Sequence, residues 1–212
     1  MSRRSFLAAC LAAALCAASG APAAAQSAQQ QQVPAAAAFV ERLAQRAIEG
    51  LTARDIDLDE RTKRFRDLLT ESFDVPKIGR FALGTAWRTA APPDREAYLK
   101  AFEDFIVATY ATRFADYGGE TIRVVSSRRL DEGEAAVGSV FERARGEPVR
   151  VDWRLAPEGQ SWKIIDVIIE GVSMAITQRD DFSATVQRNG GRVGPLIDQL
   201  REKARPTTAQ RS

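Results

Sequence analysis

The chain has 212 residues, a formal net charge of +2 at pH 7, 45% hydrophobic residues and no histidine. This composition is typical of a soluble globular protein with one main domain. The absence of histidine excludes a Ser-His-Asp triad, a histidine general base and a histidine metal site. No spacing of carboxylates matches a metal-binding loop and no glycine-rich stretch matches a phosphate loop, so we expect no metal and no cofactor.

Residues 1–25 are predicted to be a signal peptide. Arg3 and Arg4 form a short positive region, residues 6–18 are apolar but too few to span a bilayer, and Ala23–Ala25 supply small residues for cleavage. The two arginines fit a twin-arginine signal as well as an ordinary secretory one, and both indicate a periplasmic protein. Cleavage would remove both cysteines and two positive charges. The mature chain would then have no disulfide and no net formal charge, which argues against nucleic acid as a partner.

The first half of the mature chain is predicted to be helical. Residues 26–37 are rich in Gln and Ala and are interpreted as a disordered spacer before a single domain over 38–204. Apolar residues at helical spacing, proline at helix starts and glycine at helix ends define the following elements. In chain order, helices are predicted over 38–51, 59–71, 75–83 and from 92 to the glycine pair at 118–119.

After Gly119 the pattern changes to that of β-strands. Apolar and charged residues alternate most regularly from Val149 to Leu155, and turn residues separate the segments. In the last strand Ile165 is predicted to share a face with Val167 and Ile169. Strands are expected over 121–129, 136–144, 149–155 and 162–169, helices over 172–188 and 193–203, and a flexible tail over 205–212. The sequence therefore predicts an α+β domain with a four-stranded antiparallel meander and helices packed on one face.

The polar residues contain no convincing catalytic group. Asp152 and Asp166 could do acid–base work, but arginines flank Asp152 and cross-strand ion pairs are the usual role of such residues. Ser173 lacks the surroundings of a nucleophile elbow and suits the N-cap of a helix. From the residues alone, the apolar side chains could form either a filled core or a ligand cavity. The expected class is an exported domain that binds rather than catalyses.

Several short stretches resemble a known family. In chain order they are Phe73–Pro76, Phe81–Gly84, Trp87–Ala90, Arg95–Tyr98 with Phe102, Val151–Arg154, Trp162–Val167, Glu170–Ser173 and Gln178–Phe182. Together they are similar to the toluene-tolerance or MlaC family of periplasmic phospholipid carriers, over about residues 39–203. The run D-V-x-x-E-G-V-S from Asp166 to Ser173 is the most specific part. The resemblance implies a cystatin- or NTF2-like fold, without enzymatic activity, that encloses an apolar pocket between the sheet and the helices.

The resemblance also implies the partners and the ligand. Members shuttle phospholipid between an outer-membrane lipoprotein complex and an inner-membrane ABC transporter with a substrate-binding ring. Some relatives are associated with hopanoids, so a hopanoid or another isoprenoid lipid is an alternative ligand. A cystatin-like enzyme that uses Asp152 or Asp166, and a structural adaptor without ligand, are further alternatives. From the expected facing of strands and helices, the predicted lipid-binding residues are Leu83, Trp87, Phe102, Phe105, Tyr110, Val151, Trp153, Ile165, Val167, Ile169, Val172 and Ile176.

Overall fold

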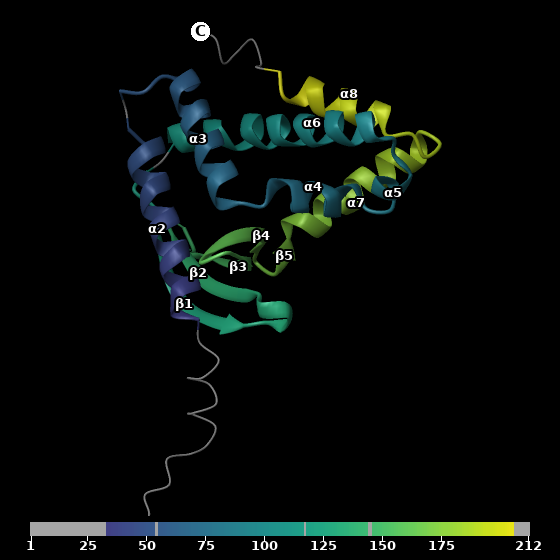
Figure 1. Cartoon of the computed structure of the whole chain (residues 1–212). Helices are drawn as coiled ribbons and strands as arrows, with labels where there is room; N and C mark the ends of the chain where they lie inside the picture. Colours follow the sequence, from purple (N-terminus) through teal and green to yellow (C-terminus); the bar gives the residue numbers. More distant parts are fainter. Residues whose placement is uncertain (1–32, 54, 117, 144–145, 206–212) are drawn as a thin grey trace, which may run out of the picture. The chain divides into compact units, whose positions relative to one another are not determined.

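The computed structural model describes residues 33–53, 55–116, 118–143 and 146–205 (Figure 1). In these residues the α-helices are α2 (Pro34–Leu51), α3 (Leu58–Ser72), α4 (Val75–Leu83), α5 (Ala86–Thr89), α6 (Pro92–Tyr110), α7 (Met174–Arg188) and α8 (Gly194–Lys203). The strands are β1 (Thr121–Arg129), β2 (Ala135–Glu142), β3 (Val149–Glu158), β4 (Ser161–Ile169) and β5 (Val172–Ser173), with 3-10 turns η1 (Ala111–Asp116) and η2 (Asp131–Gly133). The order of helices, antiparallel strands and helices confirms the predicted α+β class. The predicted signal peptide lies outside the described residues.

The strands form one antiparallel sheet in the order β1-β2-β3-β4-β5. The sequence predicted four strands, and the short β5 is the addition. Glu170 and Gly171 both adopt positive φ, which is the geometry of a tight two-residue hairpin turn. The turn brings Val172 back to pair with Ile169, so β5 extends the sheet by one short edge strand.

A β-bulge changes the side-chain facing that the sequence predicted for β4. The register shifts between Arg154 and Leu155, and Ile165 is left without a partner on β3. As a result Ile164 lies on the same face as Val167, and both pack in the same apolar cluster. Strand alternation put Ile165 on the face of Val167 and therefore Ile164 on the opposite face; the placement of Ile164 is wrong, because a period of two residues cannot reveal an inserted residue.

The buried apolar residues form two clusters. The first, called the helical cluster, belongs to α3, α4, α6, α7, α8 and the turn before α8. Its buried members are Leu69, Val75, Ala82, Leu83, Tyr98, Ala101, Phe102, Val107, Phe182, Val186, Val193, Leu196, Ile197 and Leu200. The second, called the sheet cluster, lies between α2 and the sheet. Its buried members are Val33, Ala36, Val40, Leu43, Ala135, Val137, Leu155 and Ile164.

The helical cluster is tightly packed around three aromatic rings. Tyr98 and Phe102 lie 5.9 Å apart in a stacked arrangement, and Phe182 meets each of them edge-on at 6.1 Å. The Tyr98 hydroxyl donates a hydrogen bond of 2.9 Å to the Gly79 carbonyl, and burial raises the pKa of Tyr98. A Cβ atom at Gly79 would lie 2.8 Å from a Leu99 methyl group. Glycine at this position therefore lets α4 and α6 approach closely.

Helix α2 closes the sheet cluster and begins earlier than predicted. Pro34 occupies the first turn, Ala36 is fully buried and the Val33 amide donates to the Ser127 hydroxyl of β1 at 3.2 Å. The predicted spacer is therefore wrong for residues 34–37, which form the start of a packed helix. Composition alone suggested a spacer, whereas small alanine side chains allow a helix to lie close to a sheet.

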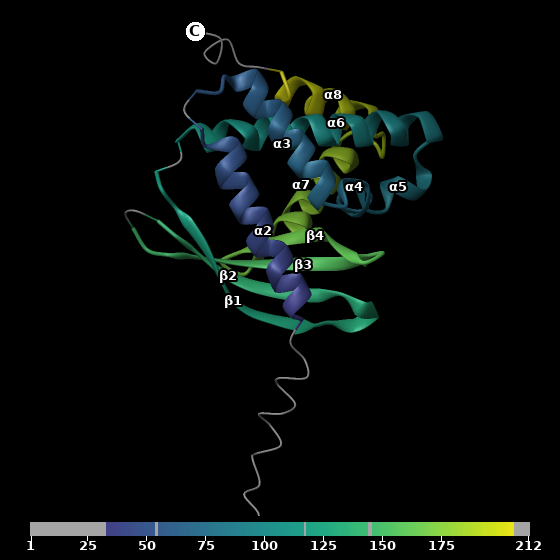
Figure 2. The ribbon, with the colours of Figure 1, turned by 60° about the vertical axis from the view of Figure 1, so that its left-hand side comes forward.

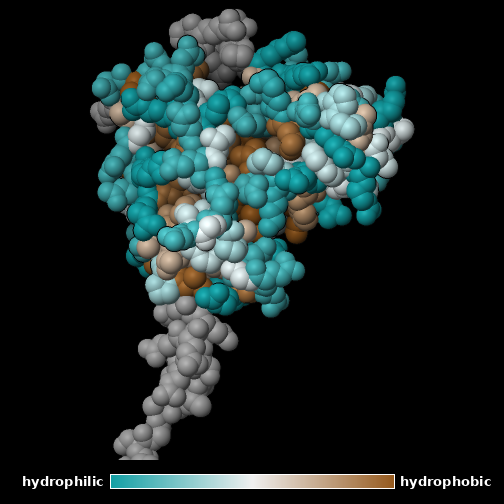
Figure 3. Space-filling model, viewed as in Figure 1, coloured by the Kyte–Doolittle hydropathy of each residue, from teal (hydrophilic) through white to brown (hydrophobic). Residues whose placement is uncertain are grey.

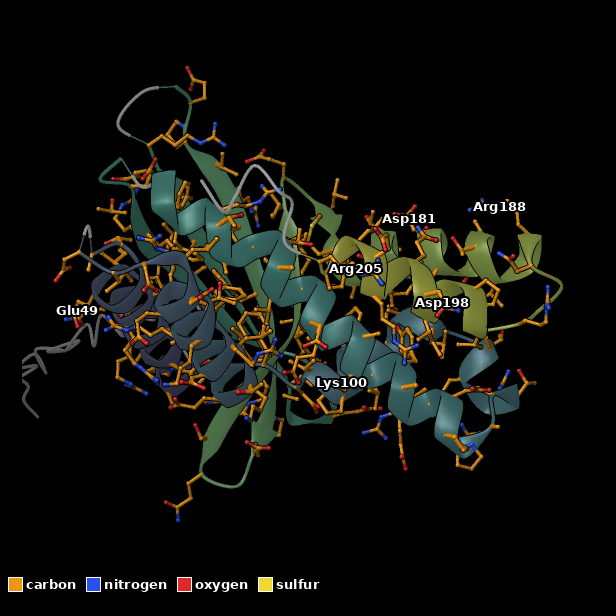
Figure 4. The ribbon with its side chains drawn as sticks, turned by 90° about the horizontal axis from the view of Figure 1, so that it is seen from above. Glu49, Lys100, Asp181, Arg188, Asp198 and Arg205 are labelled. Carbon is orange, nitrogen blue, oxygen red and sulfur yellow. The ribbon has the colours of Figure 1, made fainter. Side chains whose placement is uncertain are left out.

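The helices take two positions relative to the sheet. Helix α2 crosses one face, while α4, α6, α7 and α8 stack beyond the β4–β5 edge (Figures 1 and 2). Phe73 joins the two parts: it bridges to Ile164 on β4 and packs against both clusters, and the Asp74 amide donates to the Ile164 carbonyl at 2.9 Å. Seen from above, Lys100 on α6, Asp181 on α7 and Asp198 on α8 lie at the surface of the helical layer (Figure 4).

Candidate functional site

The face of the sheet that carries the sheet cluster, called the inner face, is covered at only one end. One row of cross-strand neighbours, Ala135, Leu155 and Ile164, is completely buried. Two rows further along, Val151 is 9% exposed and its partner Ile169 is 38% exposed. Exposure thus rises along one apolar face toward the turn between β4 and β5. We call this uncovered region the open end of the inner face.

Apolar side chains continue past the strand ends. Val172 on β5 and Ile176 on the first turn of α7 are each 53% exposed. Hydrophobic surface is visible in the region between the upper helices and the sheet (Figure 3). A soluble protein rarely gathers large exposed apolar side chains unless they meet a ligand or a partner. The arrangement therefore indicates a contact surface rather than a completed core.

The polar atoms on the inner face satisfy one another. The Trp153 indole N–H donates to the Ser139 hydroxyl at 2.9 Å, and that hydroxyl donates to the Val151 carbonyl at 2.9 Å. Ser139 is fully buried, so these bonds remove the cost of placing its hydroxyl in an apolar setting. The Trp153 indole and the Ser139 hydroxyl are therefore already hydrogen-bonded within the protein. The surrounding surface that faces a ligand is hydrocarbon.

Further aromatic residues lie near the end of α6 and in η1. Phe114 contacts Phe65 of α3 at a ring distance of 5.7 Å, and Phe65 packs against the helical cluster. Tyr110, a predicted lipid-binding residue, is 36% exposed, and the Arg113 guanidinium lies 5.3 Å from its ring centre. This segment leads directly into β1.

Nine of the twelve predicted lipid-binding residues separate into two groups. The structure brings Val151, Trp153, Val167, Ile169 and Val172 together on the inner face and its β5 extension. This grouping agrees with the facing expected from strand alternation in β3. Ile165, the extra residue of the bulge, is half-buried and belongs to neither cluster. Ile176 lies on the first turn of α7, which follows β5 directly.

Four predicted residues belong to the helical cluster instead. Leu83 and Phe102 are 1% and 2% exposed, so they fill that core and do not line an open surface. Trp87 and Phe105 are half-buried and pack against the same cluster. The structure therefore places Leu83 and Phe102 apart from the inner face, because helical periodicity identifies a buried face but not the neighbour that buries it.

Sequence reasoning missed one contributor near the site. Phe39 of α2 is half-buried against the sheet cluster. The sequence placed it on a separate helix and gave no sign of its neighbour. The apolar stripe of α2, which includes Val40 and Leu43, shows that this helix packs on an apolar surface but does not identify that surface.

Asp166 has a structural role. Its carboxylate accepts hydrogen bonds from the Ser173 hydroxyl at 2.6 Å and from the Ala175 amide at 3.1 Å. The Ser173 hydroxyl accepts in turn from the Ile176 amide at 3.0 Å, which confirms the predicted N-cap. The carboxylate lies where the positive end of the α7 dipole favours a negative charge. These contacts explain why Asp and Ser stand at the two ends of the D-V-x-x-E-G-V-S run.

Asp152 is also paired. Its carboxylate accepts from Arg150 Nε at 2.9 Å, so its partner is a neighbour on the same strand and not across the sheet as predicted. Arg154 of β3 pairs instead with Glu134, the residue before β2, at 2.7 Å. Within residues 33–205, as far as they are described, no group of three or more acidic or cysteine side chains could hold a metal ion.

The opposite face of the sheet, called the outer face, carries a cavity of about 610 Å³ with a mixed charged and apolar lining. Its lining includes Arg128, Glu134, Arg150, Asp152 and Arg154. Most of these charges pair with one another, and apolar residues such as Leu130 and Ile168 complete the lining. The two faces of the sheet therefore differ in charge: the outer face carries ion pairs, and the open end of the inner face is lined by apolar side chains.

Comparisons with known proteins identify the family. A family model described as MlaC protein matches residues 39–202. The chain is similar to toluene tolerance protein ttg2D of Pseudomonas putida, with 27% identity over 111 residues, or 52% of each chain. It is also similar to the intermembrane phospholipid transport system binding protein MlaC of Haemophilus influenzae, with 24% identity over 143 residues, or 66% of each chain. The chain thus spans about half to two thirds of the length of these relatives.

A solved structure shares the fold. A phospholipid-binding protein from Ralstonia solanacearum, crystallised with a phospholipid, superposes with a TM-score of 0.71 at 24% identity, covering 80% of this chain and 96% of that one. None of the described helices has the length and apolar character that crossing a membrane would require. The MlaC family consists of non-enzymatic lipid carriers, in agreement with the expectation from the sequence. Because the family model spans most of the chain, this protein belongs to the MlaC family.

Proposed function

We propose that this protein carries phospholipid between membranes and holds the acyl chains against the open end of the inner face. The observation that supports this most strongly is the exposure gradient from Leu155, which is fully buried, to Ile169 and Val172, which are not. A continuous apolar face that is sealed at one end and open at the other can accept a hydrocarbon chain lengthwise. The curated and structural relatives named for phospholipid support the same choice of ligand.

The energetics of such a carrier follow from the chemistry of the ligand. Two acyl chains contain roughly 30 methylenes, and each costs about 0.8 kcal/mol in water, so free lipid is strongly disfavoured in an aqueous compartment. A lipid that moves from a bilayer to an apolar protein surface exchanges one hydrocarbon setting for another. The exchange is therefore close to neutral and reversible, and the direction of transport must come from the partners.

The location and partners of this carrier form part of the proposal. The carrier would work in the periplasm, receive lipid from one membrane complex and deliver it to another. The proposed partners are an outer-membrane lipoprotein complex and an inner-membrane ABC transporter with its substrate-binding ring. The headgroup would remain at the surface beyond Ile169 and Val172, where the apolar face ends.

Substitution of Val167 by tryptophan tests the position of the acyl chains. Val167 pairs with Trp153 on the inner face and is half-buried. An indole ring in place of the smaller valine side chain would occupy the space proposed for lipid. We expect Val167→Trp to lose most of its copurifying lipid while its circular dichroism stays that of the wild type. The matched control is Val125→Trp, because Val125 is 52% exposed and lies at the β1 bulge near Gly138 of the outer face.

The two variants separate the possible outcomes. Lipid loss in Val167→Trp with retention in Val125→Trp supports the proposed site. A folded Val167→Trp protein that keeps the full lipid load would reject it. Mass spectrometry of the extracted lipid also distinguishes the ligand classes: a hopanoid in place of a glycerophospholipid would keep the carrier and replace the ligand.

A further inference from the structure

Four arginines around α4 and α5 lack acidic partners. They are Arg80, Arg88, Arg95 and Arg179, which we call the arginine patch. None of them forms an ion pair with a carboxylate in the part of the chain that the structure describes. Other helical arginines are of both kinds: Arg42 of α2 also forms no ion pair with a described residue, whereas some are paired. Arg66 of α3, for example, reaches Glu103 at 2.5 Å and Asp104 at 2.8 Å on α6.

Two of the patch arginines are held in place by a tryptophan ring and by backbone carbonyls. The guanidinium groups of Arg80 and Arg95 lie 5.9 Å and 5.4 Å from the centre of the Trp87 ring. Arg80 also donates to the Pro76 carbonyl at 3.3 Å, and Arg95 donates to the Arg88 carbonyl at 3.1 Å. The Arg95 Nε atom is buried and has no hydrogen-bond partner. These contacts fix the side chains and leave their charge uncompensated.

Arg179 reaches the same surface from α7. Its guanidinium lies 5.2 Å from the Phe81 ring centre, and Phe81 is 42% exposed. Gly84 adopts a φ of 62° between α4 and α5, and a Cβ there would lie 3.4 Å from Arg179 Nε. Glycine thus permits both the turn and the approach of Arg179. Ile176, one helical turn earlier on α7, adds a second exposed apolar side chain.

This combination has the chemistry of a protein docking surface. Guanidinium groups bind carboxylates through two parallel hydrogen bonds, and groups that are already fixed lose less side-chain entropy on binding. Trp and Arg are also the residues most often found at energetically dominant positions of interfaces. The acidic neighbours Asp94 and Glu96 are exposed and form no ion pair among the described residues, so they do not neutralise Arg95.

We propose that the arginine patch is the surface on which this protein docks to a protein partner that presents carboxylates. The inference rests on the proposed function, because a carrier must meet the complexes that load and unload it. The position of the patch suits such a transfer. Arg179 and Ile176 lie on α7, which begins directly after β5 and the open end of the inner face. A partner bound to the patch would therefore lie beside the proposed lipid site.

A protein surface explains the patch better than an anionic bilayer does. Arg80, Arg95 and Arg179 are each held against an aromatic ring, which matters for bidentate pairing and not for attraction to a diffuse surface charge. The same part of α7 also exposes Asp180 and Asp181. Anionic lipid would repel these carboxylates, whereas a folded partner can avoid them.

Charge reversal tests the docking surface. The probe is the purified soluble domain of the substrate-binding ring subunit from the same organism, with binding measured by calorimetry or biosensor. We expect Arg80→Glu with Arg179→Glu to weaken binding at least tenfold, and the wild-type affinity to fall as salt is raised. The matched control is Arg42→Glu with Arg129→Glu, because both arginines are exposed and form no ion pair with a described residue. It should bind within about twofold of the wild type.

Three further measurements keep the test decisive. Arg88→Glu serves as a second variant if the double variant misfolds, because only the backbone carbonyl of Arg88 takes part in a hydrogen bond with a described side chain. Vesicles of phosphatidylcholine with phosphatidylglycerol provide the membrane comparison. Lipid content is measured in every variant and should match the wild type.

The outcomes then divide clearly. Tenfold weaker binding of the ring domain by the patch variants alone supports the proposal. Unchanged binding by those variants, no binding by the wild type, or loss of vesicle binding in place of protein binding would overturn it. A wild-type protein that neither carries nor takes up lipid would instead overturn the proposed function, whatever the docking result.

Discussion

The helical cluster and the sheet cluster are built from similar residues but are completed differently. In the helical cluster Tyr98, Phe102 and Phe182 meet ring to ring, and each is almost completely buried. In the sheet cluster α2 buries one end of the inner face and leaves Ile169 and Val172 exposed. The helical cluster buries its apolar surface and so stabilises the fold. The sheet cluster leaves part of its apolar surface exposed to a ligand.

This difference shows why two apolar regions can have separate tasks in one domain. Removing a side chain from a closed core leaves a cavity and costs several kcal/mol. Removing one from a face that is already open leaves little new cavity, so stability changes less and ligand contact is lost. Each prediction below tests one side of this comparison.

The largest stability effect is expected in the helical cluster. Phe102→Ala removes a ring that packs against Tyr98 and Phe182, and we expect it to lower the free energy of unfolding by about 3–5 kcal/mol. Urea unfolding followed by circular dichroism measures this change. A cost below about 1 kcal/mol would show that the cluster is not closed as described.

Substitution of Asp166, which links β4 to the start of α7, should lower the free energy of unfolding by an intermediate amount. Asp166→Ala removes both hydrogen bonds at the start of α7, from Ser173 and Ala175, and a carboxylate near the positive end of the helix. We expect a loss of about 1–2 kcal/mol in unfolding free energy. Asp166→Asn, which keeps an acceptor oxygen, should retain part of that stability. If both variants were as stable as the wild type, the Asp166 carboxylate would not stabilise the start of α7.

The open end should show the opposite balance of effects. Ile169→Ser removes an apolar side chain that is 38% exposed, and we expect it to change stability by less than about 1 kcal/mol but to reduce lipid occupancy clearly. Thermal unfolding and lipid extraction on the same sample compare the two quantities. Val125→Ser is the control for an exposed valine elsewhere on the sheet. Equal lipid loss in both variants would contradict the assignment of the site.

The smallest effect is expected at a surface ion pair that belongs to neither region. The hydrogen bond from Arg46 holds the pKa of Glu71 below its ordinary value. This pair therefore adds stability above the ordinary pKa of the carboxyl group, and the contribution is lost as the pH falls through the lowered value. Both side chains are largely exposed, so Glu71→Gln should cost only about 0.5 kcal/mol at pH 7. A difference that persisted at pH 2 would contradict the pairing.

Much of the fold followed from local patterns in the sequence. Alternation fixed the facing of β3, and proline and glycine marked the ends of α4. The facing of β4 did not follow, because the bulge at Ile165 inserts one residue without any local sign. The start of α2 was also missed, since an alanine-rich segment resembles a spacer until its packing partner is known.

The candidate site was only partly predictable for a related reason. Val151, Val167 and Ile169 could be placed on one face, because strand neighbours determine each other's direction. Leu83 and Phe102 were assigned to the same face of the interior, although they fill a separate cluster. Which helix covers which part of a sheet depends on long-range packing, and the periodicity of a single helix does not contain that information.

Lipid extraction from natively purified protein, followed by mass spectrometry, tests the central claim most directly. The proposed carrier should contain a stoichiometric glycerophospholipid that is lost in Val167→Trp and kept in Val125→Trp. A protein that is isolated without lipid and takes up none from vesicles would contradict the claim, and the open end of the inner face would then need another explanation.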